Sequence, residues 1–366
     1  MILRNCFGFA LGLAIFAASG VAQDGPYKVL KTAKVGGLGG FDYIYADVPA
    51  RRLYIPRGAV QGETPVAARL TVFDLDTLAP VGEVPGVRAN GVAVDAKSGH
   101  GFASSKPVAM FDAKSLAMIK SIEIDSKASP DGIFADSFNH RIYVFSHPTK
   151  DATVIDANTG AVLGTIDLGG APEQAISDGK GHLYVVIQDK SNVAVVDAKT
   201  MKVTAHYDFG DKGSRCNGLA LDAKNRVLFA ACGQSGNPPV TPPAPQMIVL
   251  SADDGKVLTT LPLAGSSDGA EFNSKTMETF SSHGNGTMTI VKENGKASFA
   301  VEQNLQTMNG AKTLTLDTKT NHILTMAAEY GPAPAAPPAA AGAPQRGRPA
   351  RGPMLPGSFT ILVVGK

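Results

Sequence analysis

Short runs of alternating apolar and polar residues cover most of the chain, and turns rich in Gly, Asp and Asn separate them. A typical unit is GIFADSFNHRIYVF from Gly132, in which two apolar runs flank a turn that begins at Asp136. Alternation with a period of two, bounded by Gly, Asp and Asn, is typical of half-buried β-strands and not of helices. The pattern therefore predicts a chain built from strands and tight turns.

The same unit recurs seven times. One acidic or amide residue marks its turn in each copy, and successive markers lie 48, 41, 42, 44, 51 and 44 residues apart. In most copies a third and a fourth strand follow, as in TVIDANTGAVLGTIDL from Thr153. Four antiparallel strands in about 45 residues, repeated seven times, predict an all-β fold, a seven-bladed β-propeller. The turn markers are Asp47, Asp95, Asp136, Asp178, Asp222, Asn273 and Asp317.

The two ends of the chain are expected to share one blade. The seventh copy starts at Gly310, and a single further strand, FTILVVGK from Phe359, follows its first two, so this copy is one strand short. Residues 27–35, YKVLKTAKV, precede the first copy and have the pattern of a strand. We expect this N-terminal strand to close the last blade as its outer strand, because closure of the ring removes free sheet edges.

The first 22 residues differ from the repeats. Arg4 precedes an apolar run from Phe7 to Ala18, and small residues then lead to Ala22. This pattern is typical of a secretory signal peptide, with a retained N-terminal anchor as the alternative. We expect residues 1–22 to be the signal peptide and residues 23–366 to form one exported propeller, secreted or periplasmic, with no further membrane span.

Charge and motifs limit the classes of function. The 366 residues carry 34 Lys and Arg against 32 Asp and Glu, a formal net charge of +2. Such a balance gives no strong positive field, so we expect no nucleic-acid partner. The sequence contains no Cys-x-x-Cys-His, His-Glu-x-x-His, P-loop or Gly-x-Ser-x-Gly motif. These motifs would have indicated haem attachment, a zinc protease, nucleotide binding or an α/β-hydrolase nucleophile.

Several copies resemble a known family of repeats. RRLYIPRG from Arg51, HRIYVFSH from His140 and GHLYVVIQDKSNVAVVDAKTMKV from Gly181 are similar to the repeats of bacterial YVTN or YncE-like seven-bladed β-propellers. The resemblance covers residues 27–366, although the tetrapeptide that names the family is absent from every copy. It implies an exported propeller in a family whose roles are mostly unassigned or binding, and it carries over no catalytic residues.

Insertions gather on one face of the expected ring. The connections between second and third strands share a face with the blade-to-blade connections, and they are long at residues 57–69, 233–246 and 331–357. Long loops are usually functional or disordered, so we expect this loop-rich face to bind a small ligand or a cell-envelope partner. The insert at 331–357 is rich in Ala, Pro and Gly and is expected to be disordered. Its arginines could hold an acidic partner, but a solvated tether is the favoured interpretation.

Polar residues stand at the starts of the inner strands on the same face. In a propeller these positions surround the mouth of the central channel. Their oxygens could bind a small ligand or a hard cation such as Ca²⁺. The alternative is ordinary turn chemistry around a water-filled channel. The expected ring consists of Asp42, Asn90, Asp131, Gln174 beside Glu173, Asn217, Asp268 and Asn309.

Two histidines are candidates for chemistry at this mouth. His147 and His283 each follow the second strand of a copy that also contains Asp131 or Asp268. Imidazole and carboxylate groups together could bind Zn²⁺ or another divalent metal. Such a metal would polarise an ester or lactone carbonyl, with His147 or His283 available for proton transfer. The other histidines are expected to be structural: His100, His140, His182, His206 and His322.

Two hypotheses for function follow. The favoured one is a non-catalytic exported propeller that binds a ligand or partner through its loop-rich face, since no catalytic motif is present. The alternative is a metal-dependent hydrolase or lyase, similar to a lactonase, at the channel mouth.

The cysteines Cys216 and Cys232 lie nearly opposite each other across a predicted hairpin centred on Lys224. In an exported protein this arrangement predicts a disulfide. Cross-strand neighbours are geometrically tight, so two free thiols or a soft-metal pair are the alternatives.

Overall fold

A computed structural model of the chain describes residues 24–62, 65–233, 244–295, 297–333 and 351–366. The predicted signal peptide, 1–22, lies outside these residues. So does the middle of the insert that was expected to be disordered, at 334–350. Among the described residues there is no helix, and hence none with the length and apolar character needed to cross a membrane.

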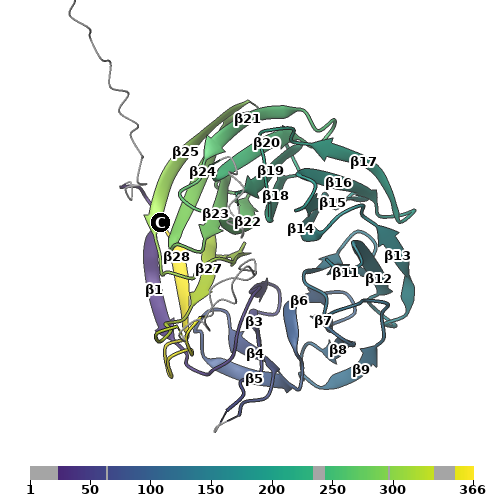
Figure 1. Cartoon of the computed structure of the whole chain (residues 1–366), viewed down its shortest axis with the longest axis vertical. Helices are drawn as coiled ribbons and strands as arrows, with labels where there is room; N and C mark the ends of the chain where they lie inside the picture. The colour runs from purple at the N-terminus through teal and green to yellow at the C-terminus, as the bar shows by residue number, and fades with distance from the viewer. Residues whose placement is uncertain (1–23, 63–64, 234–243, 296, 334–350) are drawn as a thin grey trace, which may run out of the picture.

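Seven four-stranded antiparallel sheets are arranged around a central axis, which confirms the predicted seven-bladed β-propeller (Figure 1). The inner strands of blades one to seven are β2 (Tyr45–Asp47), β6 (Ala89–Asp95), β10 (Ile133–Asp136), β14 (Pro172–Ser177), β18 (Gly218–Asp222), β22 (Ser267–Asn273) and β26 (Leu314–Asp317). The second strands are β3 (Arg52–Arg57), β7 (His100–Ser105), β11 (Arg141–Ser146), β15 (His182–Ile187), β19 (Val227–Cys232), β23 (Glu278–His283) and β27 (His322–Ala327). The third strands are β4 (Arg69–Asp74), β8 (Val108–Asp112), β12 (Asp151–Asp156), β16 (Asn192–Asp197), β20 (Gln246–Ser251), β24 (Thr287–Gly295) and β28 (Thr360–Gly365). The outer strands are β5 (Pro80–Pro85), β9 (Met118–Ile122), β13 (Val162–Asp167), β17 (Lys202–Asp208), β21 (Val257–Pro262), β25 (Ser298–Gln306) and, in blade seven, β1 (Lys28–Lys34).

The N-terminal strand closes the last blade, as the sequence predicts. β1 pairs antiparallel with β28, from Lys28 opposite Gly365 to Lys34 opposite Thr360 (Figure 1). Next to this seam Glu278 of blade six is fully buried; it accepts hydrogen bonds from the Tyr27 hydroxyl and from Lys366 Nζ. Both chain ends are therefore tied to the neighbouring blade as well as to each other.

The hydrophobic core is divided among the interfaces between neighbouring blades. Tyr184 and Val186 of blade four, for example, form one cluster with Leu219, Leu228 and Ile248 of blade five, and all five side chains are fully buried. Alternation along each strand gives every middle strand two apolar faces, one for each neighbouring blade. Burial of each such side chain stabilises the ring by roughly 1.5–3 kcal/mol.

The turns between first and second strands form a second set of contacts between blades. The fourth residue after the marker is often left-handed, as at Arg51 (φ 54°) and Arg226 (φ 59°). From there the side chain reaches the marker carboxylate of the preceding blade. We call these contacts the turn-face latches: Arg51–Asp317, His140–Asp95 and Arg226–Asp178, at 2.7, 2.9 and 3.0 Å.

The described ends of the insert in blade seven pair with each other. Tyr330 and Met354 form an antiparallel bridge, and Gly331 N donates to Pro353 O at 2.8 Å. The guanidinium of Arg351 lies over the Tyr330 ring, 5.1 Å from its centroid. The insert therefore leaves and re-enters blade seven through a short paired stem.

Candidate functional site at the channel mouth

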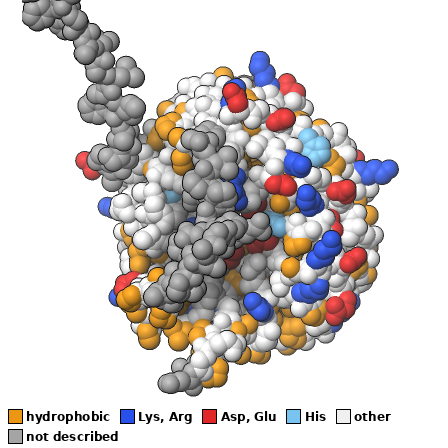
Figure 2. Space-filling view, in the orientation of Figure 1, with side chains coloured by type: hydrophobic (Ala, Val, Ile, Leu, Met, Phe, Trp, Pro, Cys, Tyr) orange, Lys and Arg blue, Asp and Glu red, His pale blue; other side chains and the backbone are white. Residues whose placement is uncertain are grey.

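The starts of the inner strands surround one end of the central channel, on the face where the second strands end. A cavity of about 250 Å³, which we call the mouth pocket, opens there. Figure 2 shows acidic side chains near the centre of one face of the ring. The mouth pocket is lined by Asp42, Tyr43, Asp131, His147, Glu173, Gln188, Asn217, Asp268 and Lys312.

Irregular strand pairing directs several of these side chains into the pocket. The register shifts between Ala89 and Val92 in β6, between Pro172 and Ala175 in β14, and between Ser267 and Gly269 in β22. Such β-bulges turn a side chain out of the regular alternation. The lining residues Glu173 and Asp268 lie in two of these shifts, and Asn90, which bonds to Asp131, lies in the third. The mouth is therefore built where the sheets depart from regular pairing.

Three ligating side chains converge on one side of the pocket. His147 Nε2 lies 3.4 Å from Asp131 Oδ2 and 3.4 Å from Glu173 Oε1. One ligand atom from each of the three lies within 4.8 Å of the other two. His147 and the carboxylates come from blades three and four, and we call the group the triad. It combines the nitrogen and oxygen ligands that divalent transition metals accept.

A second layer of polar side chains holds the triad. Asn90 Nδ2 donates to Asp131 Oδ1 at 3.1 Å. Glu173 accepts from Gln188 Nε2 at 2.5 Å and from the Tyr43 hydroxyl at 3.3 Å. Contacts of this kind orient metal ligands and fix their geometry.

Lys312 occupies the opposite side of the pocket. Its ammonium group lies 2.7 Å from Asp42 Oδ1 and 2.5 Å from Asp268 Oδ2. Asp268 also accepts from Asn217 Nδ2 at 2.7 Å. Burial lowers the pKa of Lys312, but the carboxylates of Asp268 and Asp42 outweigh burial and raise the pKa above its ordinary value. Lys312 is therefore a fixed cation that is already paired.

The triad carboxylates are less well compensated. Burial and the nearby Asp42 raise the pKa of Asp131, against the opposing effects of His147 and Lys312. Burial and the charges of Asp131 and Asp268 raise the pKa of Glu173 well above its usual range. The same environment raises the pKa of the Tyr43 hydroxyl, through burial first and then Asp131 and Glu173. Among the residues that the structure describes, the pocket thus holds more negative charge than Lys312 offsets.

The structure brings together five of the seven residues expected in the ring, with Asn90 bonded to Asp131 and the other four lining the pocket. Gln174 does not line it: its Oε1 accepts from Leu219 N and Ala270 N, both at 3.0 Å, inside the channel. Asn309 is exposed and also lies outside the pocket lining. Glu173 and Lys312 take the places expected for Gln174 and Asn309.

The number of residues between the ring position and the turn marker is constant, and this spacing identifies both Glu173 and Lys312. The ring residue stands five positions before the turn marker in every blade, which selects Glu173 before Asp178 and Lys312 before Asp317. Residue type alone, an amide near the start of the inner strand, favours Gln174 and Asn309 instead. Gln188 and Tyr43 were also missed, because neither stands at a ring position.

His283 is placed apart from the triad. It is fully buried, with Nδ1 2.9 Å from Thr287 Oγ1 and Nε2 3.2 Å from Ser281 Oγ. Burial lowers its pKa to about 3. It comes ten residues after the marker Asn273, whereas His147 comes eleven after Asp136. A shift of one residue sends a strand side chain to the opposite side, so the two histidines do not meet.

Three of the histidines that were expected to be structural have contacts on the turn face. His140 Nδ1 lies 2.9 Å from Asp95 Oδ1, and His182 Nδ1 lies 2.8 Å from Asp178 Oδ2. His100 Nδ1 lies 2.9 Å from Ala157 O. These contacts bind turns within and between blades.

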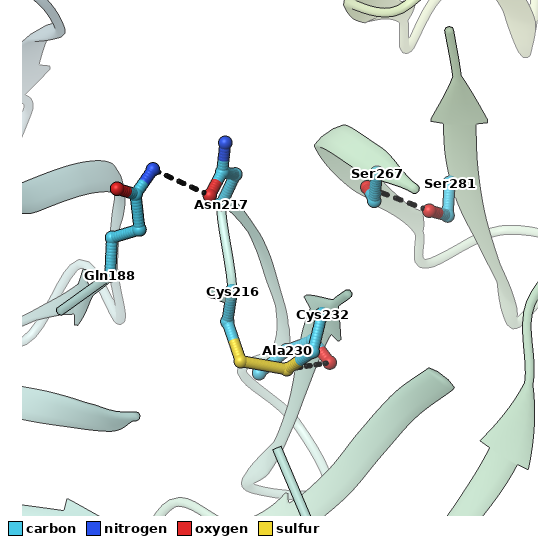
Figure 3. The surroundings of a disulfide bond; sticks show 7 residues. All are labelled: Gln188, Cys216, Asn217, Ala230, Cys232, Ser267 and Ser281. Atoms are coloured by element: carbon cyan, nitrogen blue, oxygen red, sulfur yellow. Dashed lines mark hydrogen bonds between the residues drawn. A yellow bond between two sulfur atoms is a disulfide. The ribbon is translucent and has the colours of Figure 1, made fainter. Parts of the chain in front are cut away.

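The structure joins Cys216 and Cys232 in a disulfide directly beside the mouth (Figure 3). Cys232 ends β19, and Cys216 precedes the ring residue Asn217. Asn217 Oδ1 in turn accepts from Gln188 Nε2 at 3.0 Å. The disulfide thus anchors the backbone from which Asn217 reaches the pocket.

The fold is similar to that of several solved structures. They include the crystal structure of RRP9 WD40 repeats (TM-score 0.67, 8% identity, 93% of this chain and 99% of that one). The Neurospora crassa Pan2 WD40 domain gives a TM-score of 0.62 at 14% identity, over 83% and 93% of the two chains. Kuenenia stuttgartiensis hydrazine synthase gives 0.63 at 16%, over 85% and 96%. The chain thus shares the β-propeller fold of these structures.

At these identities the likeness of this propeller to the solved structures concerns the fold alone, since one fold serves many functions. No protein-family model and no curated protein matches the sequence. The function must therefore be argued from the mouth pocket itself.

Proposed function

We propose that this propeller is an exported binding protein that holds a divalent metal ion, and a small ligand attached to it, in the mouth pocket. Asp131, His147 and Glu173 would be the metal ligands. A bound metal would supply positive charge and a coordination position for a ligand atom. The long connections on the same face would then surround that ligand or a cell-envelope partner.

The observation that carries the proposal is the convergence of the triad. Asp131, His147 and Glu173 direct one atom each toward a common point, within 4.8 Å of one another. Both carboxylates have raised pKa values because they are buried near other negative charges. A divalent cation would remove this repulsion, and the surrounding amides of Asn90 and Gln188 already orient the carboxylates.

Export and family membership are parts of the same proposal. The pattern of residues 1–22 supports secretion, and a disulfide is typical of proteins in oxidising compartments. The repeats that resemble those of the YVTN or YncE-like propellers support a place in that family. Detection of the mature chain outside the cytoplasm, with an N-terminus near Gln23, would test export.

Metal binding can be tested by calorimetric titration of the mature protein with Zn²⁺, Mn²⁺ and Ca²⁺ after treatment with a chelator. We expect one site per chain for at least one of these ions, weakened at least about 100-fold by His147→Ala or Glu173→Gln. His206→Ala is the matched control, because His206 lies in the outer strand β17, outside the mouth pocket. Equal binding by all variants, or none by the wild type, would disprove the site.

The hydrolase alternative now depends on His147 alone. His283 lies outside the pocket lining, and the buried imidazole is already engaged by Ser281 and Thr287. A screen of esters and lactones with metal-loaded protein decides between the two functions. Turnover that His147→Ala abolishes and His283→Ala leaves intact would establish an enzyme at this mouth.

A further inference from the structure

A second cavity lies inside the central channel, next to the mouth pocket. Its volume is about 340 Å³, and Tyr43 and Glu173 line both cavities. Its walls come from the inner strands of six blades and are largely apolar, with Ile133, Phe134, Ile176, Leu314 and Leu316 among the lining residues. A volume of this size accommodates a small organic molecule.

A carboxylate interrupts this wall away from the mouth, where Glu173 lies. Glu271 of β22 lines the cavity, two residues before the turn marker Asn273. The same position in the other six blades carries no charge: Tyr45, Ala93, Phe134, Ile176, Ala220 and Thr315. The channel-facing layer therefore has a single charged member.

The side chain of Glu271 makes no hydrogen bond or ion pair with any residue that the structure describes. Burial, with no contribution from another charged group, raises its pKa to about 7. A carboxylate in such surroundings is unfavourable until a cation or a hydrogen-bond donor reaches it. The chain thus keeps an unpaired acid in the channel, where no fold contact uses it.

We propose that the channel cavity is a binding site for a small organic amine, whose ammonium group pairs with Glu271 and whose apolar part packs against the channel wall. The wall favours this class over others. Sugars and other polyols need several polar partners, and the apolar positions around Glu271 do not offer them. Anions would be repelled by the carboxylate, and a bare metal ion would find only two carboxylates, Glu271 and the Glu173 that belongs to the triad. An aromatic face from Phe134 also suits a cation.

The amine site does not depend on metal at the mouth. Glu271 is not part of the triad, and it lines only the channel cavity, whereas Tyr43 and Glu173 line both cavities. If the mouth pocket binds no metal, the proposal of an amine site in the channel cavity still stands. The two proposals are tested separately because amine binding is measured in the presence of a chelator.

The probe is hexylamine, titrated calorimetrically into the mature protein in a chelating buffer at about pH 8, where its amine is protonated. We expect measurable binding to the wild type, weakened at least about tenfold in Glu271→Gln. Hexan-1-ol, which keeps the apolar chain and lacks the charge, should bind at least about tenfold more weakly than hexylamine. Glu123→Gln is the matched control, since Glu123 is exposed outside the channel.

A second variant keeps the proposal testable if Glu271→Gln alters folding. Ala93→Leu leaves Glu271 in place and fills part of the cavity from blade two, so it should also abolish hexylamine binding while thermal unfolding confirms a folded ring. Three results would overturn the proposal: undetectable binding of hexylamine to the wild type, equal binding of hexylamine and hexan-1-ol, or binding that Glu173→Gln removes and Glu271→Gln preserves. The last result would assign the amine to the mouth pocket.

Discussion

The two faces of this propeller use the same kinds of residues for opposite purposes. On the turn face, buried carboxylates such as Asp317 and Asp178 each meet an arginine of the next blade. At the mouth, the half-buried Asp131 and the buried Glu173 meet a histidine and amide groups, and the neighbouring Lys312 is already paired. The turn-face latches satisfy their charges within the chain, whereas the described residues of the mouth carry an excess of negative charge.

The pKa values follow the same division. Hydrogen bonds from Arg51 and Thr320 outweigh burial and lower the pKa of Asp317 to about 2. Burial and like charges raise the pKa of Asp131 and Glu173. Ionisation of Asp317 therefore stabilises the fold, whereas ionisation of Asp131 and Glu173 opposes it. Charge that costs stability is typical of a functional site.

Loss of a turn-face latch should have the largest effect. Arg51→Ala removes the guanidinium from Asp317, whose side chain is 3% exposed, and leaves a buried carboxylate without its ion pair. We expect the free energy of unfolding, measured with urea, to fall by about 3 kcal/mol. Asp76→Ala is the control, because it removes only the exposed partner of Arg51 and should cost less than about 1 kcal/mol. Equal effects of the two variants would show that the latch adds no stability.

The latch should also have a defined pH dependence. The folded pKa of Asp317 is depressed, so its contribution is fully present above the unfolded value of about 3.9. That contribution is lost as the pH falls through about 2. The difference in unfolding free energy between wild type and Arg51→Ala should shrink by about 2 kcal/mol between pH ~6 and pH ~2. A difference that stays constant over this range would contradict the assigned pairing.

The turn face is also the part that the sequence predicts best. The markers recur at similar spacing, and each copy repeats the same turn chemistry, so strand order and closure follow from pattern alone. Residues that recur at the same position in every copy are those that each blade needs for its own packing. His140, for example, could be assigned a structural role from its place in the turn.

The mouth was predicted only in part, because its chemistry lies in departures from the repeat. Asp131 and Asp268 were found through the Asp-Gly pairs at their strand starts. Lys312 was missed because it replaces an acid or amide by a cation, and only its spacing from Asp317 places it in the ring. Bulges in the inner strands decide which side chains enter the pocket. So does a one-residue offset, as the different positions of His147 and His283 show. Residue type reveals neither the bulges nor the offset.

Replacing a carboxylate by an amide should have the smallest effect on the free energy of unfolding, and the sign of this effect should differ between the two faces. Glu173→Gln keeps the size of the side chain and removes a buried charge near Asp131 and Asp268. In the absence of metal we expect it to raise the free energy of unfolding by about 1 kcal/mol. Asp317→Asn, the same chemical change at a latch, should lower that free energy, because the partner charge of Arg51 remains.

A saturating concentration of metal should reverse the order of stability of wild type and Glu173→Gln. A ligand at about 100 times its Kd stabilises the folded state by about 2.7 kcal/mol. Wild type should then become more stable than Glu173→Gln, while Asp317→Asn should gain as much from metal as wild type does. Thermal unfolding of the three proteins with and without Zn²⁺ measures both signs. If Glu173→Gln destabilises the metal-free protein, the carboxylate serves the fold, and the distinction between the two faces fails at this residue.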